Sequence, residues 1–238
     1  MSQSFGGLVA EKSSDVNFQS PSLSASNISH QYGNQTVMSG INMAIRAGES
    51  LAIAGPSGCG KSTLLAILSG LITPTSGEVH LGTQRIDDLP DREKRQLRLS
   101  RFAFVFQFGD LIPELRAIEN VELQGRLLGL SKEEMRIRAM DVMSALGVAD
   151  KSDRRVGELS GGEMQRVAVA RAICLKPQFV FADEPTGALD DSNTTAVIGL
   201  LLDSVQKAGS ALVLVTHDTD VAKMMHRQVR MKGGQLVE

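Results

Sequence analysis

The stretch GPSGCGKST, from Gly55 to Thr63, constrains the fold of this chain more than any other. It matches the pattern G-x-x-x-x-G-K-[ST] in full, and it lies between an apolar strand-like run and an apolar helix-like run, within Leu51 to Leu68. A strand, a glycine-rich loop and a helix in that order form the phosphate-binding unit of an α/β nucleotide-binding core. A chance glycine-rich turn is the alternative, and this context argues against it.

The chemistry of such a loop comes from its backbone and from two side chains. Glycines let the backbone approach a phosphate, so that N–H groups can wrap it; the N–H groups expected to do so belong to Gly58, Gly60, Lys61 and Ser62. We expect the Lys61 side chain to reach the β- and γ-phosphates and the Ser62 hydroxyl to bind Mg²⁺. The nucleotide would lie along Gly55, Pro56, Ser57, Gly58, Cys59, Gly60, Lys61, Ser62 and Thr63.

The composition indicates a packed protein. The 238 residues, 42% hydrophobic and 22% charged, suit one large α/β domain or a core domain with a small subdomain. A formal net charge of −2 gives no bulk attraction to nucleic acid or to an anionic membrane. We interpret the densest basic run, Arg92 to Arg101, as a solvated helix face rather than a binding patch.

The two cysteines and the chain's ends bear on its compartment. Cys59 and Cys174 lie in separate predicted elements, which indicates two free thiols in a reducing compartment. Cys59 is either a small residue that fits a tight loop or a reactive thiolate beside an anion site. No apolar stretch has the length of a membrane span, and the N-terminus does not read as a signal peptide. We expect residues 1–22, which are rich in Ser, to form a mobile tail. We also expect the protein to be cytosolic, so that any membrane part would belong to another polypeptide.

Apolar periodicity predicts the order of the elements. Strands are expected at 36–45, 49–55, 77–81 and 101–106, and helices from 114 to 173. Ser131 and Glu134 form a predicted capping box ahead of apolar residues at helical spacing: Met135, Ala139, Val142, Met143 and Leu146. Strands return at 178–183 and 211–217, on either side of a helix at 191–207, and a strand pair at 228–238 turns at Gly233-Gly234. The prediction is an α/β core interrupted by a helical segment at about 114–173.

Polar side chains follow several of these strands. Asp183 is placed to hold the Mg²⁺ shell, and Glu184 to orient or deprotonate an in-line water. Ordinary surface exposure is the alternative, but ligands bind at the carboxyl ends of strands in such sheets. His217 either reaches the γ-phosphate or is structural, and Gln107 either lies beside the metal and water or simply ends a strand. Tyr32 either stacks on adenine or covers the edge of the core.

A second glycine-containing helix start occurs in ELSGGEMQRVAVARA, from Glu158 to Ala172. A helix N-terminus binds anions. The chain already has a better phosphate site in the loop at 55–63, so the second start has no evident ligand within the same subunit.

In this order, the motifs resemble those of the ATPase subunits of ATP-binding cassette (ABC) transporters, over essentially the whole chain after the tail. Tyr32 matches the adenine-stacking position, the loop at 55–63 the Walker A motif and Gln107 the Q-loop glutamine. Leu159, Ser160, Gly161 and Gly162 match the LSGG signature, and Asp183 and Glu184 the Walker B pair. Asp190 matches the D-loop aspartate and His217 the switch histidine.

This resemblance implies a fold, a reaction and a set of ligands. The fold would be a P-loop NTPase core at 23–238 with an antiparallel β subdomain and an inserted α-helical subdomain. The reaction would be hydrolysis of ATP with Mg²⁺ held by Ser62, Gln107 and Asp183. The catalytic residues would be Lys61, Gln107, Glu184 and His217.

The resemblance also gives the second helix start a ligand. Two subunits would pack head to tail as a homodimer, with each ATP between one Walker A loop and the partner's Ser160, Gly161 and Gly162; Asp190 would belong to the same site. The signature continues as Glu163-Met164, where many relatives have Gln-Gln. The charge of Glu163 suits the first turn of a helix, and it also adds a negative charge near the partner's phosphates.

The stretches FADEPTGALD and FVFQFGDLIPELRAIENVEL are similar to the macrolide-exporter and lipoprotein-releasing group, which includes haem exporters. This similarity implies a peripheral ATPase at the cytoplasmic face of the membrane, with a separate permease docked on residues 107–129 and no nucleic-acid partner. The cargo would be a toxic amphipathic molecule, such as haem, an antimicrobial peptide or a macrolide, or a lipoprotein. One alternative is a mechanotransmission complex in cell division. Another is a soluble ABC ATPase acting on ribosomes or DNA, against which the near-neutral charge argues.

Overall fold

A computed structural model describes residues 22–106, 110–186 and 191–237, and it contains two sheets. The core sheet has six strands in the order β10-β9-β3-β8-β7-β6. Their bounds are β3 Ser50–Ala54, β6 Phe102–Phe106, β7 Phe179–Asp183, β8 Ala211–Thr216, β9 Arg227–Lys232 and β10 Gln235–Val237. The second sheet, of four antiparallel strands, has the order β2-β1-β4-β5, with β1 Leu23–Tyr32, β2 Gln35–Ile45, β4 Ser76–Leu81 and β5 Gln84–Arg85.

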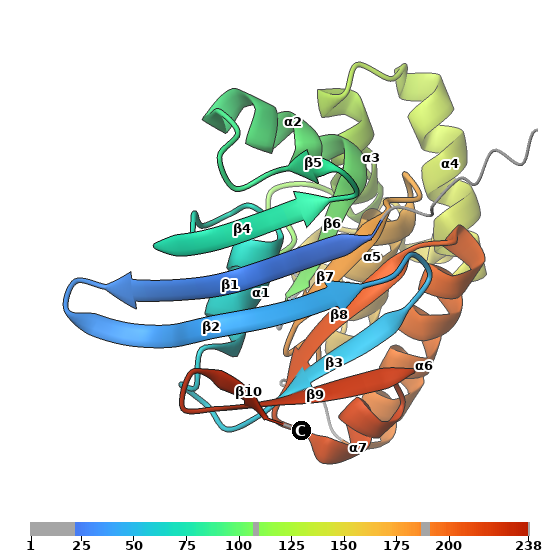
Figure 1. Ribbon diagram of the computed structural model, residues 1–238. Coiled ribbons are helices and arrows are strands. Elements are labelled where there is room, and N and C mark those ends of the chain that lie inside the picture. The colour runs from blue at the N-terminus through green and yellow to red at the C-terminus, as the bar shows by residue number, and fades with distance from the viewer. Residues whose placement is uncertain (1–21, 107–109, 187–190, 238) are drawn as a thin grey trace, which may run out of the picture.

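Strands β3, β6, β7 and β8 of the core sheet are largely buried on both faces, which explains their nearly continuous apolar residues. On β7, Phe179 and Phe181 point into the layer shared with the antiparallel sheet, while Val180 and Ala182 point into the opposite, helical layer. Helix α1, Lys61–Leu68, lies between the two sheets (Figure 1). Helices α5, Gly161–Ile173, and α6, Asp191–Ala208, cover the other face. The predicted α/β core with an antiparallel sheet and inserted helices is therefore confirmed.

The register of the parallel strands brings three strand ends to one edge. Ala54 at the end of β3 pairs with Thr216 at the end of β8, and Asp183 at the end of β7 pairs with Val215. The loop after β3, the acids after β7 and the residue after β8 therefore start from the same place. This edge is where the candidate site is built.

The helical segment is formed by α3, Ala117–Leu127, α4, Lys132–Ala145, and α5, which pack on one another, with two short 3₁₀ turns at Ala149–Lys151 and Val156–Glu158. The predicted capping box at the start of α4 forms only in part. Ser131 accepts a hydrogen bond from the Glu134 N–H at 3.1 Å, but the Glu134 carboxylate binds Arg138 at 2.7 Å. A salt bridge one turn along the helix has replaced the return bond to the backbone.

Helix α2, Asp91–Arg101, corrects the interpretation of the basic run. Lys94 is buried and donates to the Thr73 hydroxyl at 2.8 Å, and Arg98 donates to the Gly70 carbonyl at 2.7 Å. Burial lowers the pKa of Arg98. The basic residues of α2 are therefore not simply a solvated face, because two of them fasten the helix to the segment after α1.

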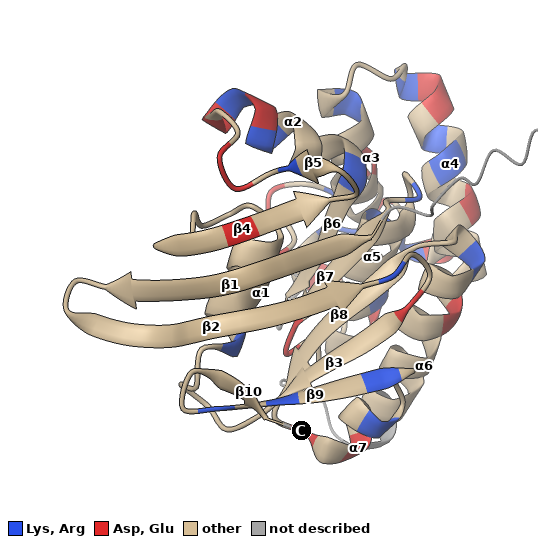
Figure 2. Ribbon diagram, viewed as in Figure 1, with Lys and Arg blue, Asp and Glu red and all other residues tan. Residues whose placement is uncertain are grey.

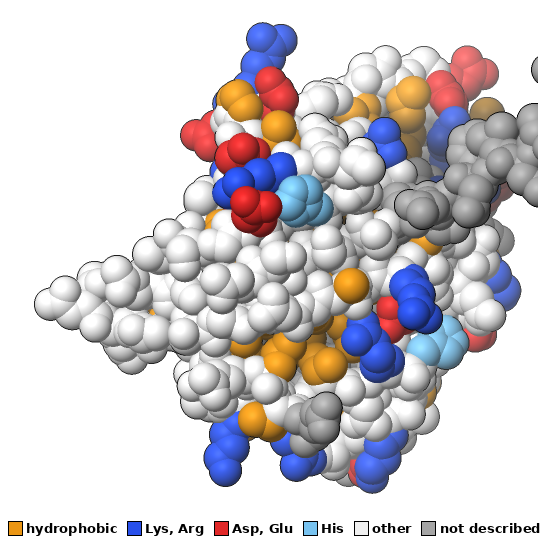
Figure 3. Space-filling view, viewed as in Figure 1, with side chains coloured by type: hydrophobic (Ala, Val, Ile, Leu, Met, Phe, Trp, Pro, Cys, Tyr) orange, Lys and Arg blue, Asp and Glu red, His pale blue; other side chains and the backbone are white. Residues whose placement is uncertain are grey.

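Charge is unevenly distributed over the surface. Strands β1 and β2 contain no Asp, Glu, Lys or Arg, whereas α2 and α4 carry many such residues (Figure 2). In the space-filling view, charged side chains stand around β1 and β2 rather than on them (Figure 3). Among the described helices, none is both long and apolar enough to cross a bilayer. The predicted tail lies almost wholly outside the described residues.

Candidate nucleotide-binding site

The glycine-rich loop joins β3 to α1 and is shaped by contact with β9. Gly60, the N-cap of α1, has φ +105°, and a Cβ there would lie 2.9 Å from Met231 Cε. At Gly55 a Cβ would lie 2.3 Å from the Met231 carbonyl oxygen, closer than atoms can approach. Both positions therefore require glycine. No side chain caps α1, so its first N–H groups remain available to an anion.

Lys61 is buried at the first position of α1, and its ammonium group is held by the loop itself. It donates to the carbonyl oxygens of Gly55 at 2.9 Å and Pro56 at 3.1 Å. It also lies 4.0 Å from Glu184 Oε1. A phosphate entering the loop would find the cation in place and would take over these contacts.

Ser62 and Asp183, the two described residues predicted to hold Mg²⁺, meet across the end of the sheet. The Ser62 hydroxyl donates to Asp183 Oδ1 at 3.0 Å. Burial raises the pKa of Asp183, and the bond from Ser62 offsets part of that effect. A hydroxyl and a carboxylate oxygen at this spacing fit Mg²⁺, which is commonly held by one or two protein oxygens, water and substrate phosphates. Within the described ranges, no group of three His, Cys, Asp or Glu side chains is placed to hold a metal ion.

Glu184 lies between the side chains of Lys61 and His217. Its Oε1 is 3.0 Å from the ring nitrogen His217 Nδ1, and the backbone N–H of His217 donates to Oε2 at 3.4 Å. Glu184 adopts φ +45°, uncommon for a residue with a side chain, while its own N–H donates to the Val215 carbonyl at 3.0 Å. Strained backbone of this kind is common at functional sites. The structure thus brings Lys61, Glu184 and His217 together at the strand ends.

Tyr32 ends β1 beside the loop. The residue is 53% exposed, and its ring stands edge-on to that of the buried His30, with ring centroids 4.7 Å apart. A cleft of about 270 Å³ is lined by Tyr32, Gln35, Val37, Gly58, Gly60, Lys61, Ser62 and Thr63. An adenine ring stacked on Tyr32 would therefore lie next to the phosphate loop.

The second helix start faces elsewhere. Ser160 is the N-cap of α5, and both it and Gly161 are exposed. Within the described part of the chain, neither residue lines the cleft at Tyr32 and Lys61. Two predicted site residues, Gln107 and Asp190, lie outside the described residues.

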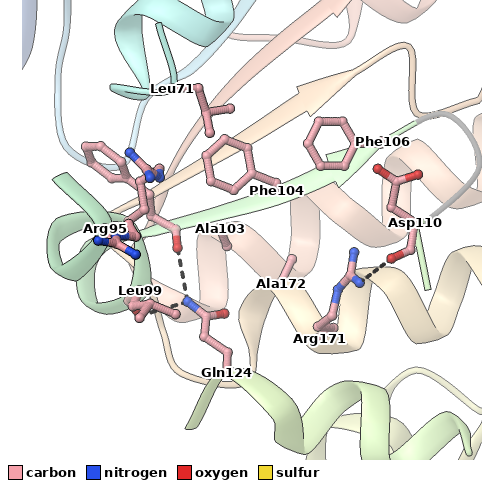
Figure 4. Close-up of a pocket in the computed structure, with 12 residues that line it drawn as sticks. Leu71, Arg95, Leu99, Ala103, Phe104, Phe106, Asp110, Gln124, Arg171 and Ala172 are labelled. Atoms are coloured by element: carbon pink, nitrogen blue, oxygen red, sulfur yellow. Dashed lines mark hydrogen bonds between the residues drawn. The ribbon is translucent and has the colours of Figure 1, made fainter. Parts of the chain in front are cut away.

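A groove that sequence reasoning did not define lies beside β6 (Figure 4). It has a volume of about 510 Å³ and is lined by Leu71, Arg95, Arg98, Leu99, Phe102, Ala103, Phe104, Phe106, Asp110, Gln124, Arg171 and Ala172. Its walls are tied together: the Gln124 amide donates to the Leu99 and Phe102 carbonyls, and Arg171 donates to the Asp110 carbonyl at 2.7 Å. The alternate phenylalanines of FAFVF were a usable signal, because alternate residues of a strand share a face.

The comparisons with known proteins agree with this geometry. A family model described as ABC transporter matches residues 38–187. The lipoprotein-releasing system ATP-binding protein LolD of Aquifex aeolicus is 43% identical over 215 residues, which are 90% of this chain and 96% of that protein. The macrolide export ATP-binding/permease protein MacB of Marinobacter nauticus is 43% identical over 202 residues, 85% of this chain and 31% of that protein.

A solved structure adds the match in three dimensions. The dimeric, post-hydrolysis structure of the ATP-binding cassette MJ0796 bound to ADP and Pi superposes with a TM-score of 0.82 and 36% identity, covering 91% of this chain and 97% of that one. Motifs, fold and sequence identity over nearly the full length therefore agree, and the chain belongs to the ABC transporter family as one of its ATPase cassettes.

Proposed function

We propose that this chain powers a separate membrane permease by hydrolysing ATP at two sites in a homodimer. The observation that carries the proposal is the meeting of Lys61, Glu184 and His217, beside the Ser62–Asp183 pair, at one edge of the core sheet. Positioning and charge stabilisation are what phosphoryl transfer to water requires, and these residues supply both.

Each group has a distinct part in the reaction. The loop N–H groups and Lys61 bind the phosphates, and Glu184 orients or deprotonates the attacking water. Mg²⁺, held by Ser62, Asp183 and Gln107, would neutralise charge on the phosphates. His217 positions Glu184, because its Nδ1 lies 3.0 Å from Glu184 Oε1. In the tautomer with the proton on Nδ1, Nε2 is only an acceptor, and the ring would have to turn before it could donate to a γ-phosphate.

The second half of each ATP site would come from the partner subunit. The start of α5, at Ser160, Gly161 and Gly162, is at the surface and away from its own cleft. A helix start at the surface, away from the nucleotide cleft of its own subunit, is suited to a phosphate supplied by another chain. The dimeric state of the MJ0796 cassette supports this arrangement, in which Asp190 would also take part.

The groove beside β6 is the proposed docking site for the permease. Its aromatic floor and arginine rim suit a partner helix with apolar and acidic side chains. It includes Asp110 and Gln124 from the predicted docking range, but also Leu71 and Arg95 from outside it. A permease there would hold the ATPase at the cytoplasmic face of the membrane.

The cargo would be set by the permease, because the nucleotide cleft contacts only ATP. The names of the relatives support an amphipathic cargo, either a lipoprotein or a macrolide. Haem and antimicrobial peptides stay predictions from the sequence resemblance.

Replacing Glu184 by Gln tests the proposal. The variant should bind ATP, hydrolyse it at least a hundredfold more slowly, and accumulate as an ATP-bound dimer, because binding rests on Lys61 and the loop while the carboxylate acts on water. Phosphate release and sedimentation in the presence of ATP measure the two effects. The matched control is Glu133→Gln, an exposed glutamate on α4. Turnover of the Glu184→Gln chain at the wild-type rate would show that Glu184 is not the catalytic carboxylate.

A further inference from the structure

The hydroxyl of Ser160 is engaged within its own subunit. Ser160 Oγ donates to Glu163 Oε2 at 2.9 Å, and the Ser160 N–H donates to the same oxygen at 2.8 Å. In return, the Glu163 N–H donates to Ser160 Oγ at 3.4 Å. One carboxylate oxygen thus receives both donors of the serine. The backbone bond from Ser160, followed by the bond from its hydroxyl, lowers the pKa of Glu163, so the carboxylate is charged at neutral pH.

The other oxygen of the same carboxylate faces a cation. Glu163 Oε1 lies 3.4 Å from Lys151 Nζ, and Lys151 also lies 3.0 Å from Asp150 Oδ2. Lys151 ends the first 3₁₀ turn, on a segment separate from α5. A small rotation of the Glu163 side chain toward Lys151 would strengthen the ion pair and break the bonds to Ser160.

A serine hydroxyl has a single proton to donate. While the Ser160 hydroxyl donates this proton to Glu163, it cannot donate it to a phosphate oxygen. The negative charge of the Glu163 carboxylate also repels the phosphate. We propose that Glu163 is a positioning residue that holds the Ser160 hydroxyl in the free subunit, and that Lys151 takes up the Glu163 carboxylate when the partner's ATP arrives. The inference rests on the proposed function, because it assumes that Ser160 meets the ATP of a second copy. Glu163 then sets how readily ATP closes the dimer.

Glu163→Gln separates this role from capping. The amide oxygen of Gln can still accept from the Ser160 N–H, but bonds to a neutral acceptor are about half as strong as bonds to a carboxylate. Releasing the hydroxyl should become about fivefold easier at each site. Since two such contacts open in each dimer, the dimer dissociation constant should fall about 25-fold.

The experiment uses the full chain carrying Glu184→Gln, so that bound ATP is not consumed, and measures dimerisation by sedimentation at saturating Mg-ATP. Glu158→Gln is the matched control. It removes one negative charge two residues from Ser160, but its carboxylate binds the Arg155 N–H instead. In chains with intact Glu184, Glu163→Gln should also lower the KM for ATP with kcat changed less than twofold. A merely structural role predicts the opposite sign, since a weakened cap cannot improve dimerisation.

Lys151→Met tests the second half of the mechanism. It should weaken dimerisation when Glu163 is present. It should have little effect in chains that also carry Glu163→Gln, because those chains have no carboxylate at position 163 for Lys151 to bind. Equal weakening in both backgrounds would overturn the role of Lys151. An unchanged dissociation constant in Glu163→Gln, or the same gain in Glu158→Gln, would overturn the role of Glu163 while leaving the proposed function intact. If the Glu184→Gln parent forms no ATP-dependent dimer, the proposed function fails and this inference fails with it.

Discussion

Mixing two inactive variants should restore activity if each ATP site is shared between two subunits. Lys61→Ala removes the cation held by the loop carbonyls, and Ser160→Arg places a long side chain where the partner's phosphate would lie. Each variant alone forms dimers with two defective sites. In a mixed dimer, one site carries both defects, and the other joins an intact Lys61 to an intact Ser160.

The size of the recovery follows from this geometry. Random exchange of equal amounts makes about half of the dimers mixed, and each mixed dimer has one intact site of two, so independent sites predict about a quarter of wild-type activity. Ser160→Arg loses the cap of α5 at a cost of roughly 1 kcal/mol. That cost is tolerable because α5 is anchored by the fully buried Val167, Ala168, Val169 and Ala170.

The assay has two readouts, because strictly coupled sites would hydrolyse nothing with one site broken. ATPase activity is measured first, and trapping of one nucleotide per mixed dimer is measured on dimers purified with two different tags. A mixture of Lys61→Ala with the wild-type chain is the reference for the activity of dimers in which one site is broken. Neither hydrolysis nor trapping in dimers proven to be mixed would refute the shared site.

Two further predictions concern stability and docking. Burial raises the pKa of Asp183, so the ionised carboxylate penalises folding at neutral pH. Asp183→Asn should therefore raise the midpoint of thermal unfolding of the nucleotide-free protein at pH 7, while it impairs Mg-ATP hydrolysis. The gain in stability should shrink as the pH falls through the raised pKa toward the ordinary value of about 3.9. A thermal midpoint that does not change at pH 7 would contradict the assigned burial cost. Leu71→Glu, in the groove beside β6, should weaken capture by permease-containing vesicles about tenfold. Ile137→Glu, at an exposed apolar position on α4 outside the groove, should not, and equal losses would show that the groove is not the docking site.

The parts of the site that could be predicted from the sequence are those in which a functional residue lies close in sequence to the end of a strand. The glycine loop, the acid pair and His217 each depend on a strand followed at once by a functional residue, and parallel pairing then brings the strand ends together. Lys61 and Glu184 could be predicted to meet for this reason, although their contact distance could not.

The remaining features depend on segments that are distant along the chain. The groove needs Leu71, Phe104 and Arg171 to converge, and the proposed release of Ser160 needs Lys151 to reach Glu163 from another turn. No local pattern encodes either meeting. The partial capping box shows the same limit at short range, because Glu134 had two partners within reach and Arg138 prevailed over the backbone.

The contact between β9 and the glycine loop has a consequence for the order of synthesis. Met231 forms one wall of the loop at Gly55 and Gly60, and the turn after β9 binds the antiparallel sheet through the Ser39 N–H and the Gly234 carbonyl, 3.1 Å apart. The loop leaves the ribosome early, but its wall leaves late. A nascent chain therefore carries the phosphate-binding sequence long before it has a finished pocket, and the last strands to emerge decide when ATP can bind. We therefore expect nucleotide binding only after β9 has left the ribosome and paired with β3.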